Sequence, residues 1–361
     1  MRKALLVTSL SLVGTVLLAS ALICLTSGCG SLGYYAQAVR GHVDIVQRAK
    51  PVAQWLADDT TPALLRERLQ LSQRIRDYAV SELHLPDNSS YRGYADLQRN
   101  AVVWNVVAAP ELSLQLKTWC FAVMGCVGYR GYFSRADAET LASELQAQGW
   151  EVSVYGVPAY STLGWTQWLG GDPLLNTFMN WPEGELARLI FHELAHQVAY
   201  ASDDTLFNES FATAVERIGG RRWLATQASA AARAEFADWE VRRADFRELT
   251  MRHRQRLQTL YDSVGTDTDK RAGKAALKTQ LDADIAALKT TRWAGFTGYD
   301  SWFAKANNAA FGLQAAYNEL VPAFERVFDQ QGGNFPRFYA EVKRMAALPM
   351  DERRAALANS R

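Results

Sequence analysis

The sequence predicts an α+β protein that is mostly helical, with a small mixed β-sheet and a long helical hairpin. Apolar residues recur at intervals of three and four through most of the chain, β-rich runs are confined to residues 91–163, and a densely charged stretch at 223–289 keeps apolar residues at helical spacing. With 361 residues, 48% hydrophobic and 21% charged, the composition is that of a globular protein. The formal net charge of +1, without a basic block, excludes a nucleic-acid partner.

The N-terminus predicts export. A basic start is followed by an apolar run over residues 4–25 and by small residues directly before Cys29. The stretch Leu25-Thr26-Ser27-Gly28-Cys29 resembles the bacterial lipobox, at which a peptidase cuts before a lipid-modified cysteine, although Thr26 stands where leucine is usual. An uncut transmembrane anchor is the alternative, because about 20 apolar residues can span a bilayer. Either interpretation places the body outside the cytoplasm.

The resemblance to a lipobox implies a lipoprotein of the cell envelope. Residues 1–28 are then the signal peptide, and residues 29–41 are a segment held at the membrane by lipid on Cys29. Gly30 follows the cysteine where an aspartate would imply retention in the inner membrane. We therefore expect the outer membrane, with the body facing the periplasm.

Two cysteines, Cys120 and Cys126, remain in the mature body. An oxidising compartment permits a disulfide between them. On one continuous strand their Cα atoms would lie too far apart, so a bridge requires a turn near Met124 and Gly125. Two buried free thiols in a strand are the alternative.

The order of elements follows from apolar spacing and from the positions of proline. Residues 42–83 predict two helices punctuated by Pro51 and Pro62. The β-rich region predicts a small mixed sheet with one helix, formed by strands at 101–108, 114–127 and 152–157 and a helix at 135–148.

The second half of the chain is expected to be helical. Two helices over residues 182–219 are separated by Ser202-Asp203-Asp204, and a helical hairpin over residues 223–289 turns at 265–273. The remaining residues, 299–348, alternate apolar helical stretches with glycine and proline breaks. The charged faces of the hairpin indicate a scaffold or a surface for a protein partner.

The segment His192-Glu193-Leu194-Ala195-His196 carries the predicted chemistry. Histidines at i and i+4 project from one face of a helix, so both imidazoles can bind one metal ion, with Glu193 beside them. Zinc lowers the pKa of its bound water, and a neighbouring carboxylate can take the proton as the water attacks a peptide carbonyl. We therefore predict His192 and His196 as zinc ligands and Glu193 as the general base. Two core histidines bonded to carbonyls are the alternative, which gives Glu193 no reason to be buried.

A catalytic zinc site needs a third protein ligand. Asn208-Glu209-Ser210-Phe211-Ala212 resembles the segment that carries the glutamate ligand in gluzincins, the group that includes thermolysin and the zinc aminopeptidases. The resemblance implies a gluzincin-like zincin core with Glu209 as the third ligand. Only twelve residues, 197–208, separate His196 from Glu209, fewer than in the best-known gluzincins, so the connecting loop must be tight.

Glu216 is the rival for the third ligand. Nineteen residues, 197–215, separate it from His196, a spacing that matches thermolysin, and it lies on the same helical face as Glu209. With Glu209 as the ligand, Glu216 can instead accept a hydrogen bond from a ligand histidine and orient its ring.

Over most of the mature chain, the sequence resembles a bacterial family of predicted zinc aminopeptidases anchored as lipoproteins. The matching stretches are 29–35, 129–133, 156–164, 192–197, 208–212 and 307–309. The resemblance implies a Zn²⁺ cofactor and a peptide substrate. It also implies a zinc peptidase core at 42–222, the hairpin at 223–290 and a C-terminal helical part of the catalytic domain at 291–361.

The resemblance to gluzincins also suggests substrate-binding residues. In those enzymes an edge strand before the metal helix holds the substrate backbone, so Tyr160 and Ser161 are expected to line the cleft. An ordinary transition from strand to loop is the alternative. The candidates for the oxyanion donor are Tyr317, Tyr299 and Tyr160, and Tyr317 is preferred because it follows Asn307-Asn308 at helical spacing.

Three functions of different class fit these observations. The first is a zinc aminopeptidase tethered to a membrane, although the residues leave endopeptidase action open. The second is a noncatalytic envelope scaffold whose hairpin binds a partner. The third is a zinc hydrolase that cleaves a non-peptide amide of the envelope.

Overall fold

The structure is a computed structural model that describes residues 29–121, 125–159 and 171–359. The chain forms two compact units, residues 1–48 and residues 49–361. In the first unit the described residues form helix α2 (Cys29–Arg48), which starts at the predicted lipid-bearing cysteine. Among the helices in the described part of the chain, none combines the length and the apolar character needed to cross a membrane.

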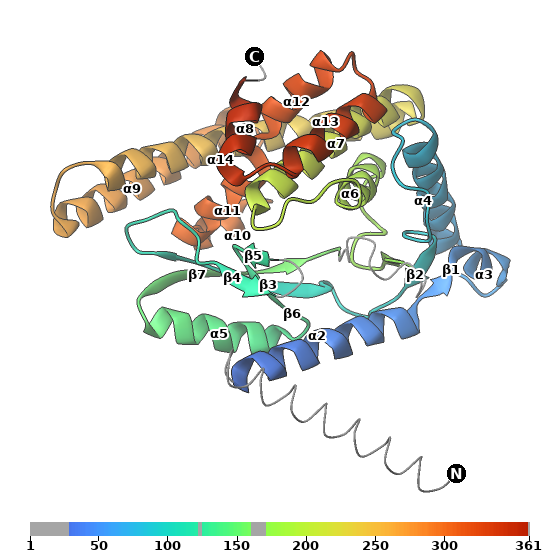
Figure 1. Ribbon diagram of the computed structural model, residues 1–361, viewed down its shortest axis with the longest axis horizontal. Helices are drawn as coiled ribbons and strands as arrows, with labels where there is room; N and C mark the ends of the chain where they lie inside the picture. The colour runs from blue at the N-terminus through green and yellow to red at the C-terminus, as the bar shows by residue number, and fades with distance from the viewer. Residues whose placement is uncertain (1–28, 122–124, 160–170, 360–361) are drawn as a thin grey trace, which may run out of the picture. The chain divides into compact units, whose positions relative to one another are not determined.

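Strand β3 (Val103–Pro110) is the centre of the main sheet of the second unit (Figure 1). It pairs antiparallel with β6 (Arg130–Tyr132) on one side and with β7 (Trp150–Val157) on the other. The strand is mostly buried because helices cover both faces of the sheet.

Helices α5 (Arg135–Ala147) and α11 (Asn308–Asn318) lie on opposite faces of this sheet (Figure 1). Ser134 begins α5 as its N-cap, accepting a hydrogen bond from the backbone N–H of Asp137 at 3.3 Å. The buried face of α5 has the helical spacing that the sequence predicted, with Ala138, Ala142 and Leu145 turned inward.

Residues 49–95 form two helices and part of a second small sheet. Helices α3 (Val52–Ala57) and α4 (Ala63–Ser81) each follow a proline at the N-cap position. Strand β1 (Lys50–Pro51) pairs with β2 (Gly93–Ala95), which pairs in parallel with β8 (Leu174–Leu175).

The prediction of only two helices over residues 42–83 was wrong, because residues 42–48 belong to α2 and precede α3 and α4. The break falls at Lys50, which is extended. A residue directly before proline is disfavoured in the helical conformation, and Lys50 precedes Pro51.

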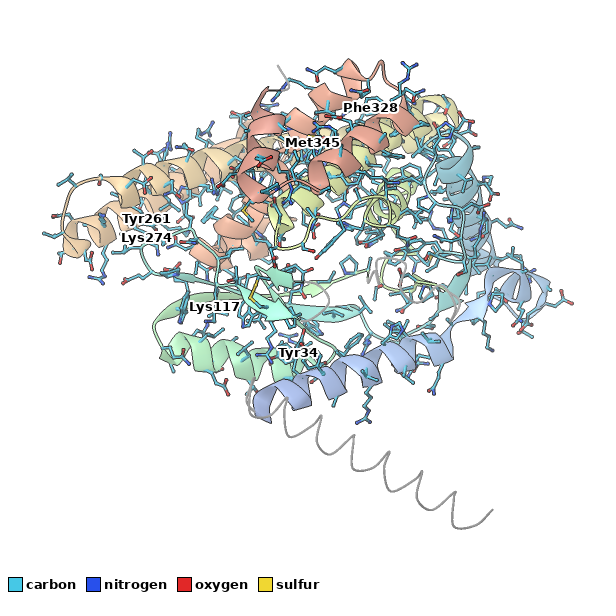
Figure 2. All side chains as sticks on the ribbon, in the orientation of Figure 1. Tyr34, Lys117, Tyr261, Lys274, Phe328 and Met345 are labelled. Atoms are coloured by element: carbon cyan, nitrogen blue, oxygen red, sulfur yellow. A yellow bond between two sulfur atoms is a disulfide. The ribbon has the colours of Figure 1, made fainter. Side chains whose placement is uncertain are left out.

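The β-rich run at 114–127 contains a hairpin. Strands β4 (Trp119–Phe121) and β5 (Gly125–Val127) pair antiparallel, with Cys120 directly opposite Cys126. A disulfide joins these cysteines, whose Cα atoms lie 3.8 Å apart, and it is visible as a yellow bond in Figure 2. Of the two alternatives left by the sequence, the structure therefore shows the bridge.

The second half of the chain is helical, as predicted. Helices α6 (Glu183–Ala195) and α7 (Thr205–Thr226) are followed by the hairpin of α8 (Ala230–Asp262) and α9 (Asp267–Thr291). The chain ends with shorter helices, α10 (Asp300–Lys305), α11, α12 (Val321–Gln330), α13 (Phe335–Ala346) and α14 (Met350–Asn359).

The turn of the long hairpin is shorter than the predicted segment 265–273. Helix α9 begins directly after Thr266, which forms a capping box with Asp269. The Thr266 hydroxyl accepts from the backbone N–H of Asp269, and the Asp269 carboxylate accepts from the backbone N–H of Thr266. These bonds supply partners for N–H groups at the helix start, so residues 267–273 are helical.

Candidate metal centre

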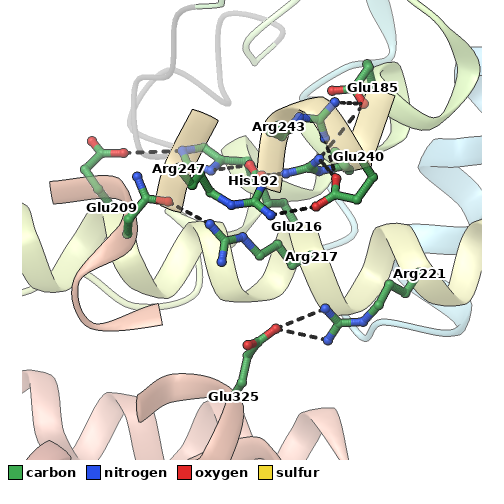
Figure 3. Close-up of polar contacts among 12 residues, drawn as sticks. Glu185, His192, Glu209, Glu216, Arg217, Arg221, Glu240, Arg243, Arg247 and Glu325 are labelled. Atoms are coloured by element: carbon green, nitrogen blue, oxygen red, sulfur yellow. Dashed lines mark hydrogen bonds and ion pairs between the residues drawn. The ribbon is translucent and has the colours of Figure 1, made fainter. Parts of the chain in front are cut away.

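Helix α6 presents the predicted metal motif from its last turn. Pro182 is the N-cap residue, Glu183 and Glu185 lie in the first turn, and His196 is the C-cap residue. Acidic side chains at the start of a helix interact favourably with its dipole. The apolar residues of the motif are completely buried, which holds the helix in place. His192 is turned toward Glu209 and Glu216 of α7 (Figure 3). His196 lies close to Glu209 as well.

Two consecutive glycines let α7 approach α6 closely. A Cβ at position 219 would lie 3.0 Å from a ring carbon of Phe191, and a Cβ at position 220 would lie 2.7 Å from Cγ of Arg188. A larger residue at either position would separate the helices. The glycines follow Glu216 by one turn, so the close approach occurs beside the predicted site.

The loop between α6 and α7 is tight, as the twelve-residue spacing required. The Asn208 side chain binds Ala201 twice, because its oxygen accepts from the Ala201 N–H and its amide donates to the Ala201 carbonyl, both at 2.8 Å. Asp204 is the N-cap of α7 and accepts from the Phe207 N–H at 3.0 Å. Asp203 has a positive φ of 64°, which turns the chain sharply before the cap. Asn208 thus ties back the loop directly before Glu209.

His192, His196 and Glu209 form one buried group, each 8–9% exposed. The two Nε2 atoms lie 3.2 Å apart, and Oε2 of Glu209 lies 3.3 Å from Nε2 of His192 and 3.6 Å from Nε2 of His196. Zinc–ligand bonds of about 2.0–2.2 Å in tetrahedral geometry place ligand atoms roughly 3.3–3.6 Å apart. The three atoms therefore fit a tetrahedral ion such as zinc with one position open.

The charges of the group match a cation site. Burial acts to raise the pKa of the Glu209 carboxyl, but the charge of His196 and the hydrogen bonds from both histidines hold that pKa well below its usual range. Burial acts to lower the pKa of His192, but the hydrogen bonds to Glu209 and Glu216 raise it well above the ordinary value. An imidazole must be neutral to bind a metal ion, so a metal ion bound here would displace the proton that the raised pKa of His192 favours.

Glu216 binds the other side of His192. Its Oε2 lies 2.9 Å from Nδ1 of His192, and its Oε1 accepts a hydrogen bond from Arg188. Burial opposes ionisation of Glu216, but Arg188 and His192 outweigh it and lower its pKa to about 2. A carboxylate at Nδ1 leaves the Nε2 lone pair for the metal. The structure therefore places Glu209, and not the rival Glu216, next to both Nε2 atoms.

The Glu193 carboxylate has no hydrogen-bond or ion-pair partner among the described residues. Burial raises its pKa, although His192 and His196 act to lower it. A carboxylate with a raised pKa is a better proton acceptor than an exposed one. Glu193 is thus available as a base beside the group of metal-binding residues.

Three tyrosines that the sequence analysis did not select interact electrostatically with Glu209. Burial raises the pKa of Tyr129, Tyr155 and Tyr200, and the charge of Glu209 raises each further. Tyr155 is also bonded to the side-chain amide of Asn105 at 3.2 Å. Tyr200 follows His196 by four residues, a spacing that could have indicated it. Tyr129 and Tyr155 come from the β-rich region, where no local pattern connects them to α7.

The residues predicted for substrate and oxyanion binding are only partly described. Tyr160 and Ser161 lie outside the described residues, and Tyr317 is on α11 with a side chain outside the described set. Tyr299 stacks on Phe246 with ring centroids 4.4 Å apart, in the aromatic cluster at the base of the hairpin. The charges that influence Tyr299 come from Arg247, Glu185, Glu240 and Arg242.

Comparison with known proteins gives one match. A family model described as "Putative aminopeptidase" matches residues 33–357. No curated protein matches the chain significantly. No solved structure does so either.

Proposed function

Since the chain belongs to the Putative aminopeptidase family, we propose that it is a zinc-dependent metallopeptidase, specifically an aminopeptidase. The observation that carries the proposal is the buried triangle of His192, His196 and Glu209 beside the carboxylate of Glu193, which has no partner among the described residues. Two imidazoles and one carboxylate are the protein ligands of a hydrolytic zinc site, in which the fourth position is left for water or substrate.

In this mechanism each residue has a defined task. His192, His196 and Glu209 would hold Zn²⁺, whose chemistry when bound would be to lower the pKa of a water and to polarise the substrate carbonyl. Glu193 takes the proton from the attacking water and delivers it to the leaving amine. Glu216 holds Nδ1 of His192, which keeps the ring in the orientation shown by the 2.9 Å contact.

We place the enzyme at the cell envelope, anchored through lipid on Cys29. The support is the sequence of residues 1–29. The substrate would then be a peptide outside the cytoplasm, and the family description favours one with a free N-terminus.

The test uses the purified full-length protein in detergent. We expect about one zinc per chain by mass spectrometry, because His192, His196 and Glu209 together provide the protein ligands of one zinc ion. A library of peptides with free amines should be cleaved, and its N-acetylated counterpart should not. Equal cleavage of both libraries would indicate an endopeptidase. Cleavage of neither, with zinc bound, would favour a scaffold or a hydrolase of another amide.

The Glu193→Gln variant tests the general base. We expect zinc to remain bound and the rate of peptide cleavage to fall by about 10²–10⁴, the usual contribution of proton transfer. The control is Glu248→Gln, since Glu248 lies on α8 with its side chain 71% exposed. Full activity in the Glu193→Gln variant would contradict the assigned role.

A further inference from the structure

A network of buried and partly buried charges continues from His192 away from the candidate metal-binding atoms (Figure 3). Glu216 uses one carboxylate oxygen for Nδ1 of His192 and the other for Nη2 of Arg188. Each oxygen therefore has its own donor, and the plane of the carboxylate is determined by both. The orientation of the His192 ring depends in this way on a residue that does not touch the metal-binding group.

Arg188 is held in place from three sides. It is 7% exposed. Its aliphatic part crosses α7 at Gly220, where a Cβ would lie 2.7 Å from its Cγ. The guanidinium lies over the ring of Phe236, with 5.8 Å between its central carbon and the ring centroid. An arginine packed in this way has lost most of its freedom before it binds Glu216.

The long hairpin supplies the last contact of the network. Oε2 of Glu240 on α8 lies 3.5 Å from Nη1 of Arg188, and the same carboxylate pairs with Arg243 at 3.0 Å and with Arg247 at 2.7 Å. Arg243 also binds Glu185 of α6 at 2.5 Å. Helices α6, α7 and α8 are therefore joined by one set of ion pairs that ends at His192.

We propose that Arg188 is a positioning residue for His192, acting through Glu216, and that Glu240 makes the hairpin part of the metal centre. The proposal rests on the proposed function, because it assumes that His192 binds zinc. It also gives the charged hairpin a task beyond that of a scaffold, namely to hold Nη1 of Arg188 while Glu216 binds Nη2.

Arg188 could act as a positioning residue or only as a nearby positive charge, and these two roles predict opposite changes in zinc affinity when it is removed. Removing a positive charge close to a cation site should strengthen zinc binding by Coulomb's law. Removing a positioning residue should weaken it, because the buried Glu216 carboxylate loses one of its two donors and no longer fixes the ring of His192. The direction of the change in zinc affinity therefore distinguishes the two roles of Arg188.

The experiment measures zinc affinity of the full-length protein by competition with a chromophoric chelator. We expect Glu216→Gln to weaken binding by about 10–100-fold and Arg188→Met by about tenfold. In the double variant, Arg188→Met should cause no further loss, because its effect passes through Glu216. Arg188→Lys should fall between the wild type and Arg188→Met, since lysine keeps the charge but not the planar fork.

The contribution of the hairpin is tested on α8 alone. Glu240→Gln should weaken zinc binding severalfold, whereas Glu248→Gln, two turns further along α8 and paired with Arg252 at the surface, should leave it unchanged. If Arg188→Met does not fold, the inference is tested with Arg188→Lys and with Glu240→Gln, compared with its control Glu248→Gln.

Several results would overturn the inference. One is zinc binding in Arg188→Met that is unchanged or tighter than in the wild type. Another is a double variant in which the losses of zinc affinity caused by Glu216→Gln and Arg188→Met are fully additive. A wild-type protein that binds zinc but cleaves no peptide would refute the proposed function and leave the inference to be decided by the affinities. A wild-type protein that binds no zinc would refute both.

Discussion

At the scale of single residues, Glu209 and Glu216 show how one helix can place two carboxylates at the two nitrogens of one imidazole. They are seven residues apart, so both face α6. Glu209 lies 3.3 Å from Nε2 of His192, and Glu216 lies 2.9 Å from Nδ1 of the same ring. The imidazole is therefore held between them, and only the carboxylate on the Nε2 side can share an ion with His196.

Substitution of the two glutamates should separate these tasks. We expect Glu209→Gln to weaken zinc binding by more than about 100-fold, because a charged ligand is lost from the group itself, and Glu216→Gln to weaken it by about 10–100-fold. Isothermal titration of metal-free protein with zinc provides the measurement. If Glu216→Gln caused the larger loss, Glu216 would be the ligand and the thermolysin-like spacing would be correct.

Much of the metal-binding group could be predicted from residues close together in the sequence. The i, i+4 spacing indicated His192 and His196, and the segment starting at Asn208 indicated Glu209. Arg188 has the same helical spacing from His192, but its partners Glu216 and Glu240 lie on other helices. A periodic pattern shows which residues share a face, and it cannot show which charge from another helix covers that face.

At the scale of elements, the hairpin of α8 and α9 carries a buried histidine in its apolar face. His253 is 4% exposed and lies midway between the buried Leu249 and Leu257, with its ring 4.7 Å from that of Phe311. Burial and the charges of Arg256 and Lys278 lower its pKa from 6.5 to about 4, although Asp284 and Asp282 oppose this. The folded hairpin therefore resists protonation of His253.

This shift predicts that acid destabilises the hairpin. Between about pH 6.5 and pH 4 the unfolded chain binds a proton that the folded protein does not, so the free energy of unfolding falls as the pH falls through this range. We expect a loss of about 1–2 kcal/mol, less than the full pKa difference implies, because the neighbouring charges are partly exposed and screened. The measurement is urea unfolding of wild type and His253→Gln at several pH values. A difference between the two proteins that does not vary with pH would contradict the assignment.

The sequence predicted the hairpin but not the details of its ends. Helical spacing extends over both helices, so they could be predicted without knowledge of their tertiary contacts. Because Thr266 forms a capping box, α9 begins inside a stretch whose glycines and aspartates indicated a turn. The β4–β5 hairpin was one of two alternatives that the sequence left open, because apolar residues on both sides of Gly125 also fit a continuous strand.

At the scale of the whole second unit, the C-terminal helix α14 is fastened to the start of α7. Asp204 is 3% exposed, and its carboxylate pairs with Arg353 at 2.7 Å and also with Arg354. The same carboxylate caps α7, the helix that carries Glu209 and Glu216. Asp204 and Arg354, 150 positions apart in the chain, are therefore joined at the start of the helix that carries Glu209. No local pattern in the sequence could have indicated this pairing.

The substitution Asp204→Asn should test how much this connection stabilises the fold. Asparagine can still cap α7 through its side-chain oxygen, but it removes the charge that pairs with Arg353, whose side chain is only 6% exposed. Breaking a buried ion pair leaves an uncompensated charge, so we expect the free energy of unfolding to fall by about 3–5 kcal/mol in urea denaturation. The surface pair of Arg221 with Glu325 is the control, and Arg221→Gln should cost less than about 1 kcal/mol because that arginine is 61% exposed. If Asp204→Asn and Arg221→Gln lowered the free energy of unfolding equally, the buried pair would contribute no more to stability than the surface pair. The position of α7 would then depend on apolar packing alone.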